Sequence, residues 1–288
     1  MADSPNQPEP QEPLSAELDA LEAGEETDQE PLPGASPPGK PVIVFKNVSI
    51  AFGDRVVLQD VSFSVRRGET LCILGRSGVG KSVSLRLLMG FLQPDAGSIR
   101  VGGEEVTTLN EEGLRAIRRR VTMVFQNGAL FDSLSVRENV AFPLREHDGD
   151  LADDQVNSLV ERLIGLVGAE DVVDELPASL STGRKRAVAI ARALAAQPEI
   201  VLYDEPTTMV DPLIARRLGN LIQRLKVQLG YTSIVVTHDT RFAESLADRV
   251  LFLDEARARY FGPWAGFMNS HDPHIREFLA LDAYVLPA

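Results

Sequence analysis

The architecture of this 288-residue chain follows from TLCILGRSGVGKSVSLRLL, Thr70 to Leu88. TLCIL is almost wholly apolar, as in a strand buried on both faces, and SVSLRLLMGF has the pattern of a helix. Between them, the glycines of GRSGVGKS let successive backbone N–H groups curl around phosphate oxygens. The order of strand, glycine-rich loop and helix predicts nucleotide binding. The predicted binding residues are Gly75, Arg76, Ser77, Gly78, Val79, Gly80, Lys81 and Ser82.

Two of these side chains have specific chemistry, and a second motif complements them. Lys81 can reach the β and γ phosphates, and the Ser82 hydroxyl can ligate Mg²⁺. In the run EIVLYDEP, four apolar residues predict a buried strand that ends in two carboxylates. Asp204 can hold Mg²⁺, and Glu205 can orient or deprotonate a water for attack on the γ phosphate. Alone, the pair would be read as two solvated carboxylates, but the phosphate loop favours the functional interpretation.

The remaining apolar runs predict an α/β fold. Runs at 71–74, 121–125, 200–203 and 233–236 are typical of parallel strands covered on both faces, and helical patterns follow at 80–90, 212–229 and 240–247. Residues 41–65 alternate apolar and polar, which predicts antiparallel strands with one solvated face. We expect a parallel-sheet core, an antiparallel β subdomain and a helical insertion at about 127–180.

Composition divides the chain into three parts. Residues 1–40 hold ten acids, one lysine and eight prolines, so they carry −9 and predict a disordered acidic tail. Leu14, Leu18 and Leu21 leave a short docking helix as the alternative. The net charge of −13 leaves only −4 for the rest, which gives no support for a nucleic-acid binder recruited by bulk charge. Residues 41–263 are the expected catalytic domain, and 264–288 a carboxyl-terminal extension that either clasps a second subunit or covers its own sheet.

The lone cysteine and the hydropathy of the chain restrict its environment. Cys72, within LCIL, is predicted to be a small core residue, and no internal disulfide can form. No window approaches 18 consecutive apolar residues, so any membrane role needs a partner.

The order of the motifs resembles the ATPase subunit of ATP-binding cassette (ABC) transporters over residues 42–255. Gly75 to Ser82 matches the Walker A loop, and Ile200 to Glu205 the Walker B strand. The other matches are Gln126 (Q-loop), LSTGR at 180–184 (signature), Val210 and Asp211 (D-loop), His238 (switch histidine) and Phe52 (the aromatic residue that stacks on adenine).

The resemblance implies an ABC-type P-loop NTPase that hydrolyses ATP with Mg²⁺. Glu205, His238 and Gln126 would be catalytic, and Ser82, Gln126 and Asp204 would hold the metal. Ser181, Thr182, Gly183 and Asp211 would complete the nucleotide site of a second subunit in a head-to-tail homodimer. An ATP phosphate from that subunit would offset the cations at 184–186, which the helix macrodipole disfavours. Thr182 and Arg184 replace the glycine and glutamine of the common LSGGQ form.

Several stretches resemble the ATPases of Mla and Mce type lipid transporters, namely GRSGVGKSV, FQNGALFDSLSVRENVAFPL, LYDEPTT and SHDPHIREFL. This implies a peripheral subunit on the cytoplasmic face of the inner membrane, integral-membrane permease subunits, an extracytoplasmic lipid-binding partner of MCE type and no nucleic acid. The permease would contact residues 126–145, where the apolar candidates are Phe131, Leu134, Val136 and Phe142. For each of them, packing of the insertion against the sheet is an equal alternative. The alternatives are a soluble ABC ATPase of a cytosolic assembly system, such as Fe–S cluster biogenesis, and a non-hydrolytic scaffold.

Overall fold

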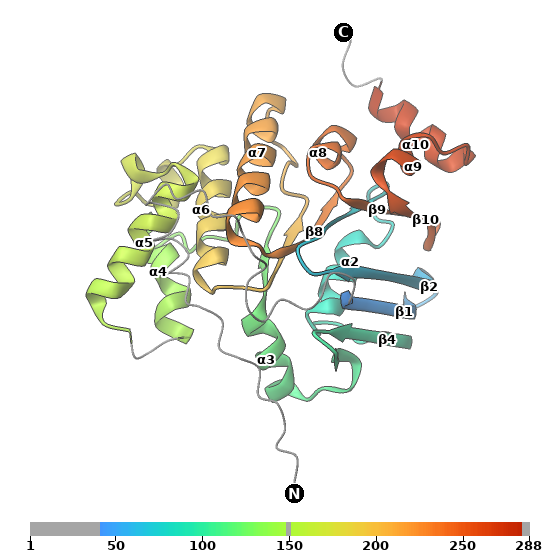
Figure 1. The fold of residues 1–288 in the computed structure, drawn as a ribbon, viewed down its shortest axis with the longest axis horizontal. Helices are drawn as coiled ribbons and strands as arrows, with labels where there is room; N and C mark the ends of the chain where they lie inside the picture. The colour runs from blue at the N-terminus through green and yellow to red at the C-terminus, as the bar shows by residue number, and fades with distance from the viewer. Residues whose placement is uncertain (1–40, 148–150, 284–288) are drawn as a thin grey trace, which may run out of the picture.

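The computed structural model describes residues 41–147 and 151–283, so the predicted acidic tail lies outside the described residues (Figure 1). The larger sheet has the strand order β10-β9-β3-β8-β7-β6. Its central strands pair in parallel, and β10 pairs antiparallel with β9 at one edge. The bounds are β3 Thr70–Leu74, β6 Val121–Val124, β7 Ile200–Asp204, β8 Thr232–Thr237, β9 Arg249–Asp254 and β10 Arg257–Pro263.

This sheet is buried on both faces, as its apolar runs predict. In β3, Leu71 and Ile73 belong to one core, and Cys72 and Leu74 belong to the core on the opposite face. The first core contains residues of α2 (Lys81–Leu88), α3 (Glu111–Arg120) and the smaller sheet; the second contains residues of the other long helices. The expected parallel-sheet α/β core is confirmed, and Cys72 is fully buried.

The smaller sheet is antiparallel, in the order β2-β1-β4-β5. Its strands are β1 Pro41–Phe52, β2 Arg55–Arg66, β4 Ala96–Val101 and β5 Glu104–Glu105. Alternate residues of β1 and β2 are buried, which matches their alternating sequence. Glycine at 53 and aspartate at 54 form the turn between β1 and β2, beside the predicted nucleotide site.

Helices α4 (Val136–His147), α5 (Asp153–Val167) and α6 (Thr182–Ala195) pack together on the side opposite the smaller sheet (Figure 1). Short 3₁₀ turns at Glu170–Val172 and Pro177–Ser179 link α5 to α6, and another follows β5 at Val106–Thr108. Buried Asn139 ties the entry to α4, because its side-chain amide donates to the carbonyls of Phe131, Leu134 and Ser135 at 3.1, 2.9 and 3.0 Å. Val136 is fully buried, so of its two predicted roles the packing role is confirmed and the permease-binding role is wrong.

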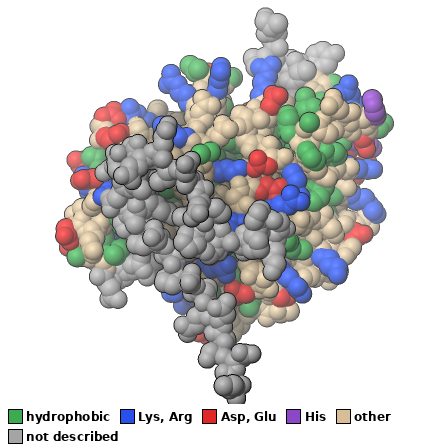
Figure 2. Space-filling view, in the orientation of Figure 1, with side chains coloured by type: hydrophobic (Ala, Val, Ile, Leu, Met, Phe, Trp, Pro, Cys, Tyr) green, Lys and Arg blue, Asp and Glu red, His purple; other side chains and the backbone are tan. Residues whose placement is uncertain are grey.

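The remaining helices complete the second core. They are α7 (Pro212–Leu229), α8 (Thr240–Glu244), α9 (Trp264–Met268) and α10 (Pro273–Ala283). Phe267 of α9 and Phe278 of α10 pack on Phe252 of β9, with ring centroids 5.6 and 5.0 Å away. Where the surface is visible in Figure 2, acidic and basic side chains are interspersed, in keeping with the small net charge outside the tail.

Candidate functional site

The loop from Gly75 to Gly80 turns the chain from β3 into α2, and its conformation requires glycine. Gly75 and Gly80 have φ angles of 153° and 105°, and a Cβ on Gly80 would lie 2.8 Å from the Val57 carbonyl oxygen. Gly80 is also the N-cap of α2, which has no side-chain cap and no acid in its first turn. The backbone N–H groups of this helix start are therefore available to an anion, so the cradle fits a phosphate.

Lys81 is held inside this loop. Its side chain is 5% exposed, and Nζ donates to the carbonyl oxygens of Gly75 and Arg76 at 2.9 and 3.1 Å. Nζ also lies 3.1 Å from Glu205 Oε1. The cation of the phosphate loop is thus paired with the carboxylate that the sequence predicts to be catalytic.

Ser82 and Asp204 meet across the same edge of the sheet. Ser82 Oγ donates to Asp204 Oδ1 at 2.6 Å. Burial raises the pKa of Asp204, and the neighbouring Glu205 charge adds to that effect. A hydroxyl beside a buried carboxylate is an all-oxygen donor set that suits Mg²⁺.

Glu205 joins Lys81 to His238, which follows β8. His238 Nδ1 lies 2.8 Å from Glu205 Oε2. Burial by itself would raise the pKa of Glu205, but His238 and Lys81 outweigh it, so that pKa is lowered. The hydrogen bond to Glu205 raises the pKa of His238. Glu205 has a left-handed φ of 47°, a strained conformation that clusters at functional sites.

Two predicted site residues, Phe52 and Gln126, form no hydrogen bond or ion pair with Lys81, Glu205 or His238 in the described part of the chain. Phe52 ends β1 with its ring 49% exposed, so an aromatic face is open beside the loop. Arg55 Nη2 donates to the Gly78 carbonyl at 3.0 Å and ties this turn to the phosphate loop, a contact that sequence patterns do not signal. The strand before Gln126 ends at Val124, and the exposed Gln126 side chain forms no hydrogen bond within residues 41–147 and 151–283.

Ser181, Thr182 and Gly183 form the start of α6. Ser181 is the N-cap, and its Oγ accepts from the Arg184 N–H at 3.4 Å. Thr182 has no positive φ angle, so its replacement of glycine does not strain the backbone. A Cβ on Gly183 would lie 2.8 Å from Ile214 Cγ2 of α7, so a larger residue there would require the Ile214 side chain to shift. Ser181 and Gly183 line a surface groove, and no hydrogen bond joins the start of α6 to Lys81 within residues 41–147 and 151–283.

Two of the cations at this helix start have partners within the chain, which the sequence analysis does not anticipate. Arg184 pairs with Asp171. Arg186 is buried, and it donates to the carbonyl oxygens of Phe125 and Thr208 at 3.3 and 3.2 Å. Burial lowers the pKa of Arg186. Structural anchoring therefore accounts for part of the basic sequence that anion binding alone is expected to explain.

The D-loop match begins α7. Asp211 is the N-cap, and its Oδ1 accepts from the Leu213 N–H at 2.8 Å. Two residues earlier, Met209 is 94% exposed with a φ of 58°. The loop therefore projects an apolar side chain outward beside Glu205.

The family model described as ABC transporter matches residues 58–208, from β2 to the loop after β7. The chain belongs to the ABC transporter family. This ABC protein is 39% identical to the methionine import ATP-binding protein MetN of Brucella abortus over 86% of its own length and 67% of the relative. It is 36% identical to the intermembrane phospholipid transport system ATP-binding protein MlaF of Escherichia coli over 83% and 88% of the two chains.

Solved structures agree with the fold. The ABC protein superposes on cbiO1 of Clostridium perfringens, part of the transporter complex cbiONQ, with a TM-score of 0.73 and 26% identity, covering 84% and 92% of the chains. It also superposes on a dimeric post-hydrolysis state of the ATP-binding cassette MJ0796, bound to ADP and Pi, with a TM-score of 0.69 and 28% identity. That match covers 77% of this chain and 98% of the MJ0796 chain. The predicted ABC-type P-loop NTPase fold is confirmed. The protein is an ATP-binding subunit whose ATP hydrolysis is coupled to transport.

Proposed function

We propose that this subunit uses ATP to energise a separate membrane permease that moves phospholipid or another hydrophobic molecule across the cell envelope. The observation that carries the ATPase chemistry is the convergence of Lys81 and His238 on Glu205 at one edge of the sheet, at 3.1 and 2.8 Å from its two carboxylate oxygens. Residues 41–263 would form the ATPase domain, and 264–288 its extension.

The contacts suggest how the site works. Lys81 Nζ has three oxygen partners and would exchange some of them for β- and γ-phosphate oxygens. That exchange would release Glu205 to orient the attacking water and accept its proton. His238 would hold Glu205 in place and approach the γ phosphate. Phe52 would stack on adenine.

Ser82 and Asp204 are the residues that would hold Mg²⁺, with Gln126 as a further predicted ligand. The close pair of oxygens supports this assignment for Ser82 and Asp204, whereas the exposed Gln126 would have to move towards them. When bound, the ion would neutralise developing charge on the phosphates.

We further propose that two copies pair head to tail, so that Ser181, Thr182, Gly183 and Asp211 of each copy complete the site of the other. The open start of α6 supports this pairing, because its N–H groups and dipole favour an anion, and residues 41–147 and 151–283 of its own chain place none against those N–H groups. The similar cassette MJ0796 is described as dimeric with ADP and Pi.

Two observations support a lipid cargo. The similarity to MlaF extends over 88% of that relative. The motif SHDPHIREFL, which carries part of the resemblance to lipid-transporter ATPases, leads into α10. An inner-membrane permease and an extracytoplasmic MCE-type protein would be the partners. Within the described ranges no helix is long and apolar enough to cross a membrane.

A methionine importer is the second candidate, because the relatives named MetN are 39% identical. Affinity purification from membranes, followed by identification of the permease and of bound lipid, separates the two. We expect co-purified phospholipid and ATP turnover that lipid stimulates in the reconstituted complex. Stimulation by methionine and its binding protein instead would contradict the lipid proposal while leaving the ATPase assignment intact.

A further inference from the structure

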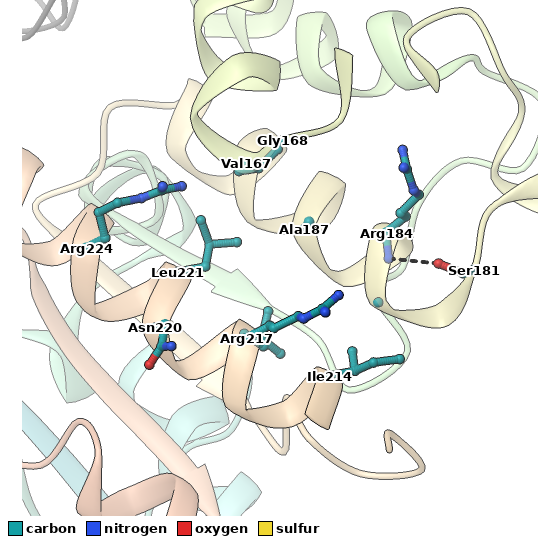
Figure 3. Close-up of a pocket in the computed structure, with 12 residues that line it drawn as sticks. Val167, Gly168, Ser181, Arg184, Ala187, Ile214, Arg217, Asn220, Leu221 and Arg224 are labelled. Carbon is teal, nitrogen blue, oxygen red and sulfur yellow. Dashed lines mark hydrogen bonds between the residues drawn. The ribbon is translucent and has the colours of Figure 1, made fainter. Parts of the chain in front are cut away.

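A groove lies beside Ser181, between the starts of α6 and α7 and the end of α5 (Figure 3). It has a volume of about 480 Å³. Its apolar walls come from Val167, Ala187, Ile214, Leu218 and Leu221. The groove can therefore accept apolar side chains from a segment that docks on it.

Three arginines, Arg184, Arg217 and Arg224, also line the groove. Asp171 compensates the charge of Arg184. Arg224 Nη2 donates to the Leu166 carbonyl at 2.6 Å and pairs with no carboxylate of the described residues. Arg217 has no hydrogen bond or ion pair to residues 41–147 or 151–283, and neither α6 nor α7 contains an acid. The groove thus combines apolar walls with two uncompensated positive charges.

One segment of this chain has the complementary pattern. Residues 1–40, which lie outside the described residues, carry a net charge of −9. Within them Leu14, Leu18 and Leu21 are spaced for one face of a helix, and the acids Glu17, Asp19 and Glu22 lie among them. The leucines match the apolar walls of the groove, and the acids match its guanidinium groups.

We propose that the acidic segment 1–40 docks in this groove of its own chain, with the leucines at 14, 18 and 21 against the apolar walls. This inference rests on the proposed function, because the docked segment covers Ser181 and Gly183, where a second subunit would bring its ATP. Docking and pairing then compete for one surface, and the segment restrains turnover until it is displaced.

The chain is long enough for this. The 22 residues from Leu18 to Lys40 span up to about 70 to 80 Å when extended. A domain of this size has a radius of gyration of about 18 Å. A tether of this kind holds the segment at an effective concentration on the order of millimolar, so a weak intrinsic affinity suffices.

A disulfide in the full-length protein tests the docking directly. Cys72 is the only cysteine and is fully buried, so introduced cysteines react without background. Ser15→Cys leaves the leucines intact, and Asn220→Cys places its partner at the groove. Val227→Cys, on the 71% exposed surface of the same helix but outside the groove, is the matched control.

We expect an intramolecular disulfide between positions 15 and 220, formed without ATP, and little between 15 and 227. Arg217→Glu with Arg224→Glu should slow its formation by about fivefold through charge repulsion, whereas Arg216→Glu, one residue away and outside the groove, should not. Equal cross-linking of both cysteine pairs, a product with the mass of two chains, or equal effects of the charge variants would overturn the proposal.

The locked protein then tests the competition. Oxidised Ser15→Cys/Asn220→Cys should lose most of its ATP turnover and recover it on reduction, and undiminished turnover when locked would refute the restraint. Because the cross-linking needs no ATP, its failure is distinguishable from a failure of the proposed function, which would appear as absent turnover in the reduced protein.

Discussion

The starts of α2 and α6 are both predicted to bind phosphate, yet they differ in what surrounds them. At α2 the cap is Gly80, and Lys81 and Ser82 are paired with Glu205 and Asp204 of the same chain. At α6 the cap is Ser181, on an open face, and the nearby arginines are anchored to other parts of the chain. One helix start is assembled by folding alone, whereas in the proposed pairing the other supplies half of a site that a second subunit completes.

The largest effect is expected at the site beside the start of α2, which a single chain assembles. Glu205→Gln should lower ATP turnover by about 10²- to 10³-fold, because the amide cannot accept a proton from the attacking water. ATP binding should persist, since the phosphate loop is untouched. Phosphate release and equilibrium nucleotide binding measure the two effects, and near-normal turnover would show that Glu205 is not the base.

Mixing two variants tests whether the start of α6 completes the site of a second subunit. Lys81→Ala disables one half of each site, and Ser181→Arg the other, so each variant alone should be inactive. Random mixing should restore about a quarter of wild-type turnover, since half of the dimers are mixed and each has one intact site. A mixture as inactive as its components would contradict the shared-site arrangement.

Two alanine substitutions compare the backbones of the helix starts. Gly80→Ala should lower the free energy of unfolding by about 2 to 4 kcal/mol, because its φ of 105° strains an L-residue and the Val57 carbonyl cannot withdraw. Gly183→Ala should cost less than about 1 kcal/mol, since its φ is helical and only an Ile214 methyl group must move.

Thermal or urea unfolding measures both variants. Ile214→Ala should remove the remaining penalty of Gly183→Ala and should not affect Gly80→Ala. Equal decreases in the free energy of unfolding for Gly80→Ala and Gly183→Ala would show that the backbone at the start of α2 is no more demanding than that at the start of α6.

The smallest expected effect is a pH dependence. Glu205 raises the pKa of His238, so their interaction stabilises the fold fully below the unfolded pKa of about 6.5 and is lost as pH rises through the folded pKa. His238→Gln should therefore lower stability most at acidic pH, by less than about 1 kcal/mol because the imidazole is 49% exposed. Unfolding of the wild type and the variant at several pH values checks this. A stability difference between them that grows as the pH rises would contradict the inference that Glu205 raises the pKa of His238.

Sequence patterns predict the parts of the molecule that depend on local order. The runs that become β3, β7 and β8 are apolar enough to require burial, and the loop between β3 and α2 follows from its glycines. The run VLFL in β9 carries the same apolar signal and is a strand beyond those predicted above. Strand β4, AGSIRV, has little strand propensity, and its conformation depends on pairing with β1.

Contacts between distant segments are the part that the sequence does not predict. Nothing in the local pattern pairs Arg55 with Gly78 or Arg184 with Asp171, because each contact depends on how separate elements pack. The helical pattern at 240–247 is longer than α8, which ends at Glu244. Residue type identifies the candidate side chains at the site, and the tertiary fold decides which of them meet.

The buried guanidinium of Arg186 has a consequence for how the subunit can signal. It belongs to the signature helix α6, and its two hydrogen bonds end on the strand exit before Gln126 and on the loop between Glu205 and Asp211. Arg192, further along the helix, donates to the Ala129 carbonyl at 2.8 Å. A displacement of residues 125–129 therefore strains both arginines, and Arg186 passes that strain to the loop between Glu205 and Asp211. The segment proposed to face the permease and the loop beside the catalytic carboxylate are thus linked through one side chain.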